Sequence, residues 1–265
     1  MMKKKYPKHI NKFTTVCVEA ALAGGKVLEK HYNTGIKVSY KGRIDPVTAA
    51  DKTSQDVITK IIKKHFPDHT VVGEEDEKHP ECSEYCWIID PLDGTVNFIH
   101  GMKLFSVSIA LTHKGKILSG VVYAPMLDEL FVAQKGLGSF LNGVRIRVSD
   151  KNTLIRSLVV TGFPYDVDSK TNEVIASFKN MLTNAQGVRR LGSAALDMCY
   201  VACGRMDAFW ELGLKAWDVA AGALIVNEAG GRVTDFEGKN NFLYGGRLLA
   251  SNGLIHNKMK SLIKK

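Results

Sequence analysis

The feature that most constrains the fold is a series of strand-like runs from Phe105 to Val148. Short breaks with the sequences HKGK, PMLD and KGLG separate these runs. Because connections this short join antiparallel neighbours, the pattern predicts an antiparallel meander. Helices are predicted before it over residues 13–28 and about 48–65, where apolar residues recur at helical spacing. Helices combined with antiparallel strands indicate a layered α+β architecture.

A second group of elements begins near Ser149. The predicted strands have the sequences SLVVTGF, RMDAFWEL, GRVTDF and RLLAS, and the predicted helices cover about 172–182, 193–203 and 216–230, followed by a short terminal helix. A chain of 265 residues is long enough for roughly two domains or for one large mixed domain. We expect a single unit with two lobes, 1–148 and 149–265, that share one core.

The net charge of the chain is +9, which alone favours a nucleic-acid or acidic-membrane partner. The excess of positive charge lies at the two ends, in residues 3–12 and 258–265, and neither end contains an acid. Between them, 27 basic residues balance the 27 acidic ones. We therefore do not favour a nucleic-acid-binding protein, although a role with RNA or the transcription machinery stays open.

Cysteine content and hydropathy indicate the compartment. The five cysteines are an odd number, so they cannot all pair, and we expect free thiols in a reducing environment. No segment approaches the roughly 20 apolar residues of a membrane span. The sequence predicts a cytoplasmic protein without a membrane partner.

The densest candidate site is WIIDPLDGT, residues 87–95. An apolar strand delivers Asp90, and Asp93 follows three residues later. Two carboxylates this close resist joint ionisation unless a cation holds them, and Mg²⁺ is a natural ligand for such oxygens. The amides of Gly94 and Thr95 could hold a phosphate where the next helix begins. An ordinary Asp-Gly turn is the alternative for this segment.

Two other segments supply acids. Glu74 and Glu75 end an apolar strand, and Asp218 lies at a helix start. Taken singly, a solvated turn and a helix N-cap explain them more simply. Together with Asp90 and Asp93, they favour a metal site.

These motifs carry a family resemblance. GEE, WIIDPLDGT and WDVAAG, in this order, resemble the lithium-sensitive, Mg²⁺-dependent phosphatases, and within them the inositol monophosphatase family in its bacterial form. DPVTAAD (45–51), GFPY (162–165) and RRLGSAALD (189–197) support that branch, and the resemblance runs from about residue 10 to 255. It implies a homodimer and a five-layered αβαβα sandwich with a metal-binding first lobe and a substrate-side second lobe.

The resemblance also implies residue roles. Two or three Mg²⁺ ions would be held by Glu74, Asp90, the carbonyl of Leu92, Asp93 and Asp218. Thr95, oriented by Asp45, would activate the attacking water together with Glu74. The phosphate would meet the amides of Gly94 and Thr95. The alcohol part would meet Asp93, Gly192, Ser193, Ala194 and Glu211. Arg189 and Arg190 are expected to have a structural role near the dimer contact.

The implied reaction is Mg²⁺-dependent hydrolysis of a small phosphate monoester, first of all inositol monophosphate. The reaction is very slow without a catalyst, and paired metal ions suit in-line attack by an activated water. The alternatives with the same chemistry are fructose 1,6-bisphosphate, a nucleotide phosphate and histidinol phosphate. The alternative of another class is a role in binding RNA or the transcription machinery, with which some bacterial relatives associate.

Overall fold

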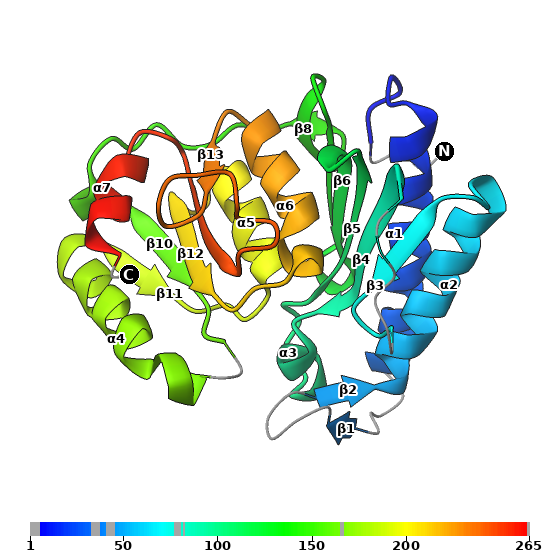
Figure 1. The fold of residues 1–265 in the computed structure, drawn as a ribbon, viewed down its shortest axis with the longest axis horizontal. Helices are drawn as coiled ribbons and strands as arrows, with labels where there is room; N and C mark the ends of the chain where they lie inside the picture. Colours follow the sequence, from blue (N-terminus) through cyan, green and yellow to red (C-terminus); the bar gives the residue numbers. More distant parts are fainter. Residues whose placement is uncertain are drawn as a thin grey trace.

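The computed structural model describes residues 6–32, 38–40, 46–76, 81, 83–164 and 167–263. Helices and sheets alternate in five layers (Figure 1), which confirms the predicted αβαβα sandwich. From one side to the other, the helical layers are α4 (Val167–Asn184) with α7 (His256–Leu262), α5 (Ala194–Ala202) with α6 (Ala216–Glu228), and α1 (Lys12–Tyr32) with α2 (Ala49–His65).

The larger sheet has seven strands in the order β3-β4-β5-β6-β7-β8-β9. They are β3 (Thr70–Gly73), β4 (Tyr85–Asp93), β5 (Ser106–His113), β6 (Lys116–Ala124), β7 (Glu129–Gln134), β8 (Gly138–Leu141) and β9 (Val144–Arg145). Only the β3–β4 pair is parallel among these described strands. The predicted meander is therefore confirmed as β5 to β9.

The smaller sheet is mixed, with the order β11-β10-β12-β14-β13. Its strands are β10 (Leu158–Thr161), β11 (Gly187–Arg189), β12 (Ala208–Leu212), β13 (Arg232–Thr234) and β14 (Arg247–Ser251). β10 is parallel to β11 and β12, whereas β14 is antiparallel to β12 and β13. Shorter elements are β1 (Val38–Tyr40), β2 (Pro46–Thr48), α3 (Thr95–Ile99) and two 3₁₀ turns, Pro125–Leu127 and Leu154–Arg156.

The two helices between the sheets pack closely on both of them. One buried apolar cluster contains side chains of α5, α6 and both sheets. A Cβ at Gly120 of β6 would lie 2.8 Å from the carbonyl oxygen of Ala221, so α6 rests on bare strand backbone there. Ser108 of β5, which lies opposite Asp90 of β4, donates a hydrogen bond to the carbonyl oxygen of Trp217 at 3.2 Å, and the first turn of α6 is thereby held beside Asp90.

The strand that carries Asp90 differs from the prediction. The sequence predicts an apolar strand that delivers Asp90, but β4 continues through Pro91 to Asp93. Asp90 pairs with Ser108 and Asp93 with Ser106, so three steps along β4 oppose two along β5, as in a bulge. Alternate residues of a strand share a face, and the extra residue therefore puts Asp90 and Asp93 on the same face. Proline is tolerated at such a position because it needs no ladder partner.

The described cysteines are not all free thiols. Cys17, Cys199 and Cys203 are free thiols, but Cys86 is disulfide-bonded, so the expectation of free thiols is wrong for Cys86. Cys82 lies outside the described residues. No helix in the described part of the chain combines the length and apolarity that crossing a bilayer requires.

Candidate active site

A cavity of about 200 Å³ lies between the two sheets. Its lining includes the end of β4 and the starts of α5 and α6. The predicted site residues that line it are Glu74, Asp93, Gly94, Gly192, Ser193, Ala194, Glu211 and Asp218. Asp90, Leu92 and Thr95 are buried directly behind this lining, within the same segment of β4 and α3. The structure thus brings together residues that are far apart in the sequence.

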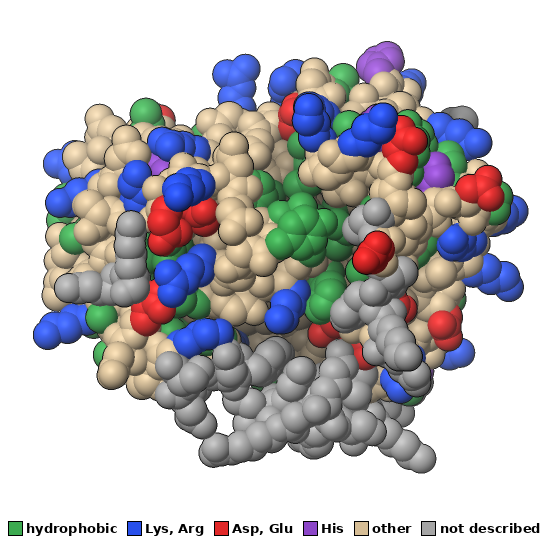
Figure 2. All heavy atoms as spheres, in the orientation of Figure 1, with side chains coloured by type: hydrophobic (Ala, Val, Ile, Leu, Met, Phe, Trp, Pro, Cys, Tyr) green, Lys and Arg blue, Asp and Glu red, His purple; other side chains and the backbone are tan. Residues whose placement is uncertain are grey.

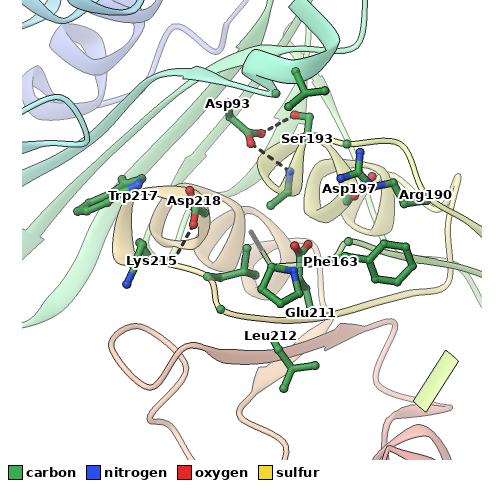
Figure 3. A pocket seen from close by; sticks show the side chains of 18 of the residues that line it. Asp93, Phe163, Arg190, Ser193, Asp197, Glu211, Leu212, Lys215, Trp217 and Asp218 are labelled. Carbon is green, nitrogen blue, oxygen red and sulfur yellow. Dashed lines mark hydrogen bonds between the residues drawn. The ribbon is translucent and has the colours of Figure 1, made fainter. Parts of the chain in front are cut away.

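Asp93 connects the larger sheet to α5. Its carboxylate accepts a hydrogen bond from the hydroxyl of Ser193 (Figure 3) and others from the backbone N–H groups of Ala195, at 2.9 Å, and Ala194, at 3.2 Å. Ser193 is the N-cap of α5. Burial raises the pKa of Asp93, while these donors lower it. A carboxylate at this place also gains from the positive end of the helix dipole.

The other acids respond to one another's charge. Burial, and then the charges of Glu74, Asp93 and Asp218, raise the pKa of Asp90 well above its usual value. Burial and the charge of Glu74 likewise raise the pKa of Asp218. Each of these two carboxylates also accepts a backbone hydrogen bond, Asp90 from Leu92 at 2.9 Å and Asp218 from Lys215 at 2.6 Å. Like charges have therefore been concentrated at one end of the cavity.

This set of donors fits a hard divalent cation. All of the acids offer carboxylate oxygens, which Mg²⁺ prefers, and a bound cation would relieve their mutual repulsion. Among the described residues, no three His, Cys, Asp or Glu side chains converge into a preformed cluster of metal ligands. The reason is local: Asp90 and Asp218 each direct one oxygen to a backbone amide, and Asp93 directs both of its oxygens to amides of α5. To bind an ion together, the three carboxylates have to turn toward it or share their remaining lone pairs with it.

Thr95 contacts an acid that the sequence reasoning did not select. Its hydroxyl lies 3.4 Å from a carboxylate oxygen of Asp51 and 3.0 Å from the carbonyl oxygen of Leu92. The predicted partner, Asp45, lies outside the described residues. Asp51 is held in place because its other oxygen accepts the backbone N–H of Thr48, at 2.8 Å, in the capping box of α2. Burial raises the pKa of Asp51 to about 6.

Glu211 lies deep in the wall that the smaller sheet provides. It extends from β12 with 8% of its surface exposed, and its carboxyl occupies the space that a Cβ at Gly162 would need. Burial raises the pKa of Glu211 to about 8, with Arg190 acting in the opposite direction and Asp93 in the same direction. Residue 162 therefore has to be glycine for the carboxyl to take this position.

Several residues that line the cavity were missed from the sequence. Among them are Phe163, Asp197 and Trp217. Arg190, for which a structural role was expected, and Lys215 line the cavity as well. The spacing could have revealed Asp197, because residues four apart share a helix face and Ser193 had already been selected. No comparable pattern marks Phe163 or Trp217, which stand among other apolar residues.

An α+β fold of two sheets with an acid-lined cavity between them is the arrangement of a hydrolase that binds metal ions. The comparison of sequences identifies the family. Residues 9–265 match the Inositol monophosphatase family, and the chain belongs to that family. It is thus a member of a family of metal-dependent phosphatases that act on phosphate esters.

Two relatives of the chain carry different names. It is 42% identical to the inositol-1-monophosphatase of Mesorhizobium japonicum, over 94% of this chain and 95% of the relative. It is 43% identical to the Nus factor SuhB of Pasteurella multocida, over 91% and 92%.

Solved structures agree with this family membership. The inositol monophosphatase from Anabaena sp. PCC 7120 has a TM-score of 0.86 at 44% identity and covers 94% of each chain. The extragenic suppressor protein suhB from Bartonella henselae has a TM-score of 0.92 at 41% identity and covers 96% of this chain and 99% of its own. The fold is therefore shared along almost the whole chain.

Proposed function

We propose that the protein hydrolyses inositol monophosphate to inositol and phosphate with the help of Mg²⁺. The observation that carries this proposal is the division of the cavity. Asp93 and Asp218 stand at one end, and Glu211 stands in the wall beyond them. The first end suits a cation and a phosphate, and the second suits a hydroxylated alcohol. The 42% identity to an inositol-1-monophosphatase supports the same assignment.

The acids in β4, directly after β3 and on α6 would bind the metal ions. Glu74, Asp90 and the carbonyl oxygen of Leu92 would hold a first ion, and Asp90, Asp93 and Asp218 a second, with Glu74 near a third. Bound Mg²⁺ would neutralise the phosphate and lower the pKa of a coordinated water. The carboxylates keep lone pairs for this task, because each oxygen offers two and the backbone amides use only part of them.

Thr95 and Asp51 would remove a proton from the attacking water. The Thr95 hydroxyl can accept that proton while it donates its own to Asp51, 3.4 Å away. A carboxyl whose pKa is about 6 is a suitable base at neutral pH. The amides of Gly94 and Thr95 would bind the phosphate. The sequence resemblance gave the role of partner of Thr95 to Asp45, which lies outside the described residues. We assign it to Asp51, because Asp51 is the described acid that contacts Thr95.

The alcohol part of the ester would lie against α5 and β12. Gly192, Ser193 and Ala194 form the start of α5, which Asp93 holds against the larger sheet. The Glu211 carboxyl would accept a hydrogen bond from a hydroxyl group of the substrate. These residues orient the alcohol so that the phosphate reaches the acidic end.

A panel of phosphate esters tests this proposal. Purified protein with Mg²⁺ is assayed on inositol 1-phosphate, fructose 1,6-bisphosphate, NADP, 3′-phosphoadenosine 5′-phosphate and histidinol phosphate, with and without lithium. We expect the highest kcat/KM on inositol 1-phosphate and inhibition by lithium. Negligible turnover of every inositol monophosphate would reject the inositol assignment, and turnover of another ester would replace it.

A role with the transcription machinery is a second candidate, because the chain is 43% identical to a Nus factor SuhB. The basic ends are the segments suited to RNA, since Figure 2 shows basic side chains interspersed with acidic ones over the face it presents. RNA and polymerase binding are compared between the full chain and a chain without residues 1–12 and 258–265. No binding by the full chain at low salt would remove this candidate.

We also expect a homodimer in the cytoplasm. Light scattering of the purified protein measures the first property, and cell fractionation measures the second. A monomer at micromolar concentration would contradict the expected assembly.

A further inference from the structure

One wall of the cavity contains a buried acid to which the proposed function gives no role. Asp197 lies on α5 and is 1% exposed, and it is one of the residues that line the cavity. Neither of its carboxyl oxygens has a hydrogen-bond partner among the described residues. Nearly all buried polar atoms in proteins have such a partner, because an unpaired one reduces stability. The wall therefore contains two acceptors that the described part of the protein does not use.

A structural acid in the same chain behaves differently. Asp207 is also buried, and both of its oxygens are paired: one accepts the hydroxyl of Ser149 at 2.5 Å and the other accepts the backbone N–H of Leu158 at 2.7 Å. Asp207 thus ties the start of β10 to the loop before β12. Asp197 makes no such connection. Its carboxyl forms no hydrogen bond with a described residue and therefore does not hold the fold together as Asp207 does.

The charged side chain of Arg190 lies next to Asp197. Figure 3 shows Arg190 beside Asp197, on the side of the cavity away from Asp218. The guanidinium lies over Gly192, where a Cβ would come within 2.6 Å of it. Arg190 is exposed, so its side chain can move. It lines the same cavity as Asp197. Burial and the charge of Glu211 raise the pKa of Asp197, and Arg190 lowers it, so the three groups lie within electrostatic reach.

We propose that Asp197 and Arg190 form a subsite for two neighbouring hydroxyl groups on the alcohol part of the substrate. This inference rests on the proposed function, which places the alcohol against α5. The carboxyl oxygens of Asp197 can accept hydrogen bonds and the guanidinium of Arg190 only donates them, whereas a hydroxyl does both. A vicinal diol satisfies the pair, with one hydroxyl donating to Asp197 and its neighbour accepting from Arg190. Esters of polyols are then preferred over aryl or simple alkyl phosphates.

The test compares two esters on one variant. Asp197→Asn keeps the volume of the side chain and removes its charge. Steady-state kinetics with Mg²⁺ are measured on inositol 1-phosphate, which has vicinal hydroxyls, and on p-nitrophenyl phosphate, whose alcohol part has none. One hydrogen bond to a charged group accounts for roughly a tenfold change in affinity. We expect kcat/KM to fall about tenfold on the inositol ester, mainly through KM, and less than twofold on the aryl ester.

Two more variants complete the experiment. Arg190→Gln, at an exposed position, should show the same selective loss without a change in folding. Glu173→Gln is the matched control, because Oε1 of Glu173 is also buried without a partner among the described residues but Glu173 does not line the cavity. It should behave as wild type on both esters.

The outcomes separate the two proposals. Equal losses on both esters in Asp197→Asn, or no loss on either, would overturn the diol subsite. If the wild type hydrolysed neither ester, the proposed function would fail, and calorimetric titration with inositol 1-phosphate would decide the subsite. Binding at least several-fold weaker in Asp197→Asn than in wild type would support it, and equal binding, or none by either protein, would overturn it.

Discussion

The carboxylate of Asp93, at the end of β4, accepts a hydrogen bond from the hydroxyl of Ser193, the N-cap residue of α5. The two residues are 100 positions apart and belong to different layers of the sandwich. The bond fixes the start of α5 against the larger sheet, and two backbone amides of the same helix reinforce it. Asp93, which we propose as a metal ligand, therefore also connects β4 to the start of α5, where we place the alcohol part of the substrate.

Replacing Asp93 separates these two tasks. Asp93→Asn keeps an oxygen that can accept from α5 but removes the charge that a cation requires, so we expect hydrolysis to fall at least 100-fold while the fold is retained. Activity with Mg²⁺ and circular dichroism measure the two effects. Survival of activity would show that Asp93 is not a metal ligand. Ser193→Ala is the counterpart, since it removes the helix cap and should lower the free energy of unfolding by about 1 kcal/mol.

The pH dependence of catalysis tests the pairing of Thr95 with Asp51. The Asp51 carboxyl has to be ionised to take up a proton, and its pKa is raised to about 6. We therefore expect kcat/KM to increase with pH through an apparent pKa near 6. In Asp51→Asn this limb should disappear and kcat should fall by two to three orders of magnitude.

Asp45→Asn provides the control for this assignment. It changes the acid at the other end of the same seven-residue motif, and it should keep the limb near pH 6. Loss of the limb in Asp45→Asn but not in Asp51→Asn would return the role to Asp45.

The fold was predictable where the signals are local. Breaks such as HKGK and KGLG define the meander because their residues specify turns between neighbours, and the apolar spacing of α1 and α2 defines helices. The strand order β11-β10-β12-β14-β13 was not predictable, since it depends on pairing between segments far apart. The bulge that aligns Asp90 with Asp93 was also missed, because it depends on how β5 pairs with β4.

The site was predictable in part for the same reason. Asp90 and Asp93 lie in one short motif and could be selected together. Asp51 shares a motif with Asp45, and only the structure shows that Asp51 contacts Thr95. Asp197 looks like an ordinary helix acid until its burial and its unpaired oxygens are known.

Gly162 should control the position of Glu211. A methyl group at residue 162 would occupy the place of the Glu211 carboxyl and displace it from the wall. We expect Gly162→Ala to raise KM for inositol 1-phosphate about fivefold, as the loss of one hydrogen bond of about 1 kcal/mol would. A double-mutant cycle checks the mechanism: in a Glu211→Ala background, Gly162→Ala should have little further effect. Additive effects would mean that residue 162 acts independently of Glu211.

Gly120 should limit stability rather than catalysis. A Cβ there would meet the backbone of Ala221 at 2.8 to 3.3 Å, and backbone in a packed helix cannot move aside cheaply. We expect Gly120→Ala to reduce the free energy of unfolding by about 1–3 kcal/mol, which lowers Tm by roughly 2–4 °C for each kcal/mol. Gly187→Ala on the edge strand β11 is the control, because its nearest atoms, at 3.3 Å, are the ends of the Arg189 and Leu158 side chains, which can shift. Thermal unfolding of both variants should show a clear loss of stability for Gly120→Ala and a change within about 1 kcal/mol for Gly187→Ala. Equal losses of stability would mean that the packing of α6 does not depend on its contact with bare backbone in β6.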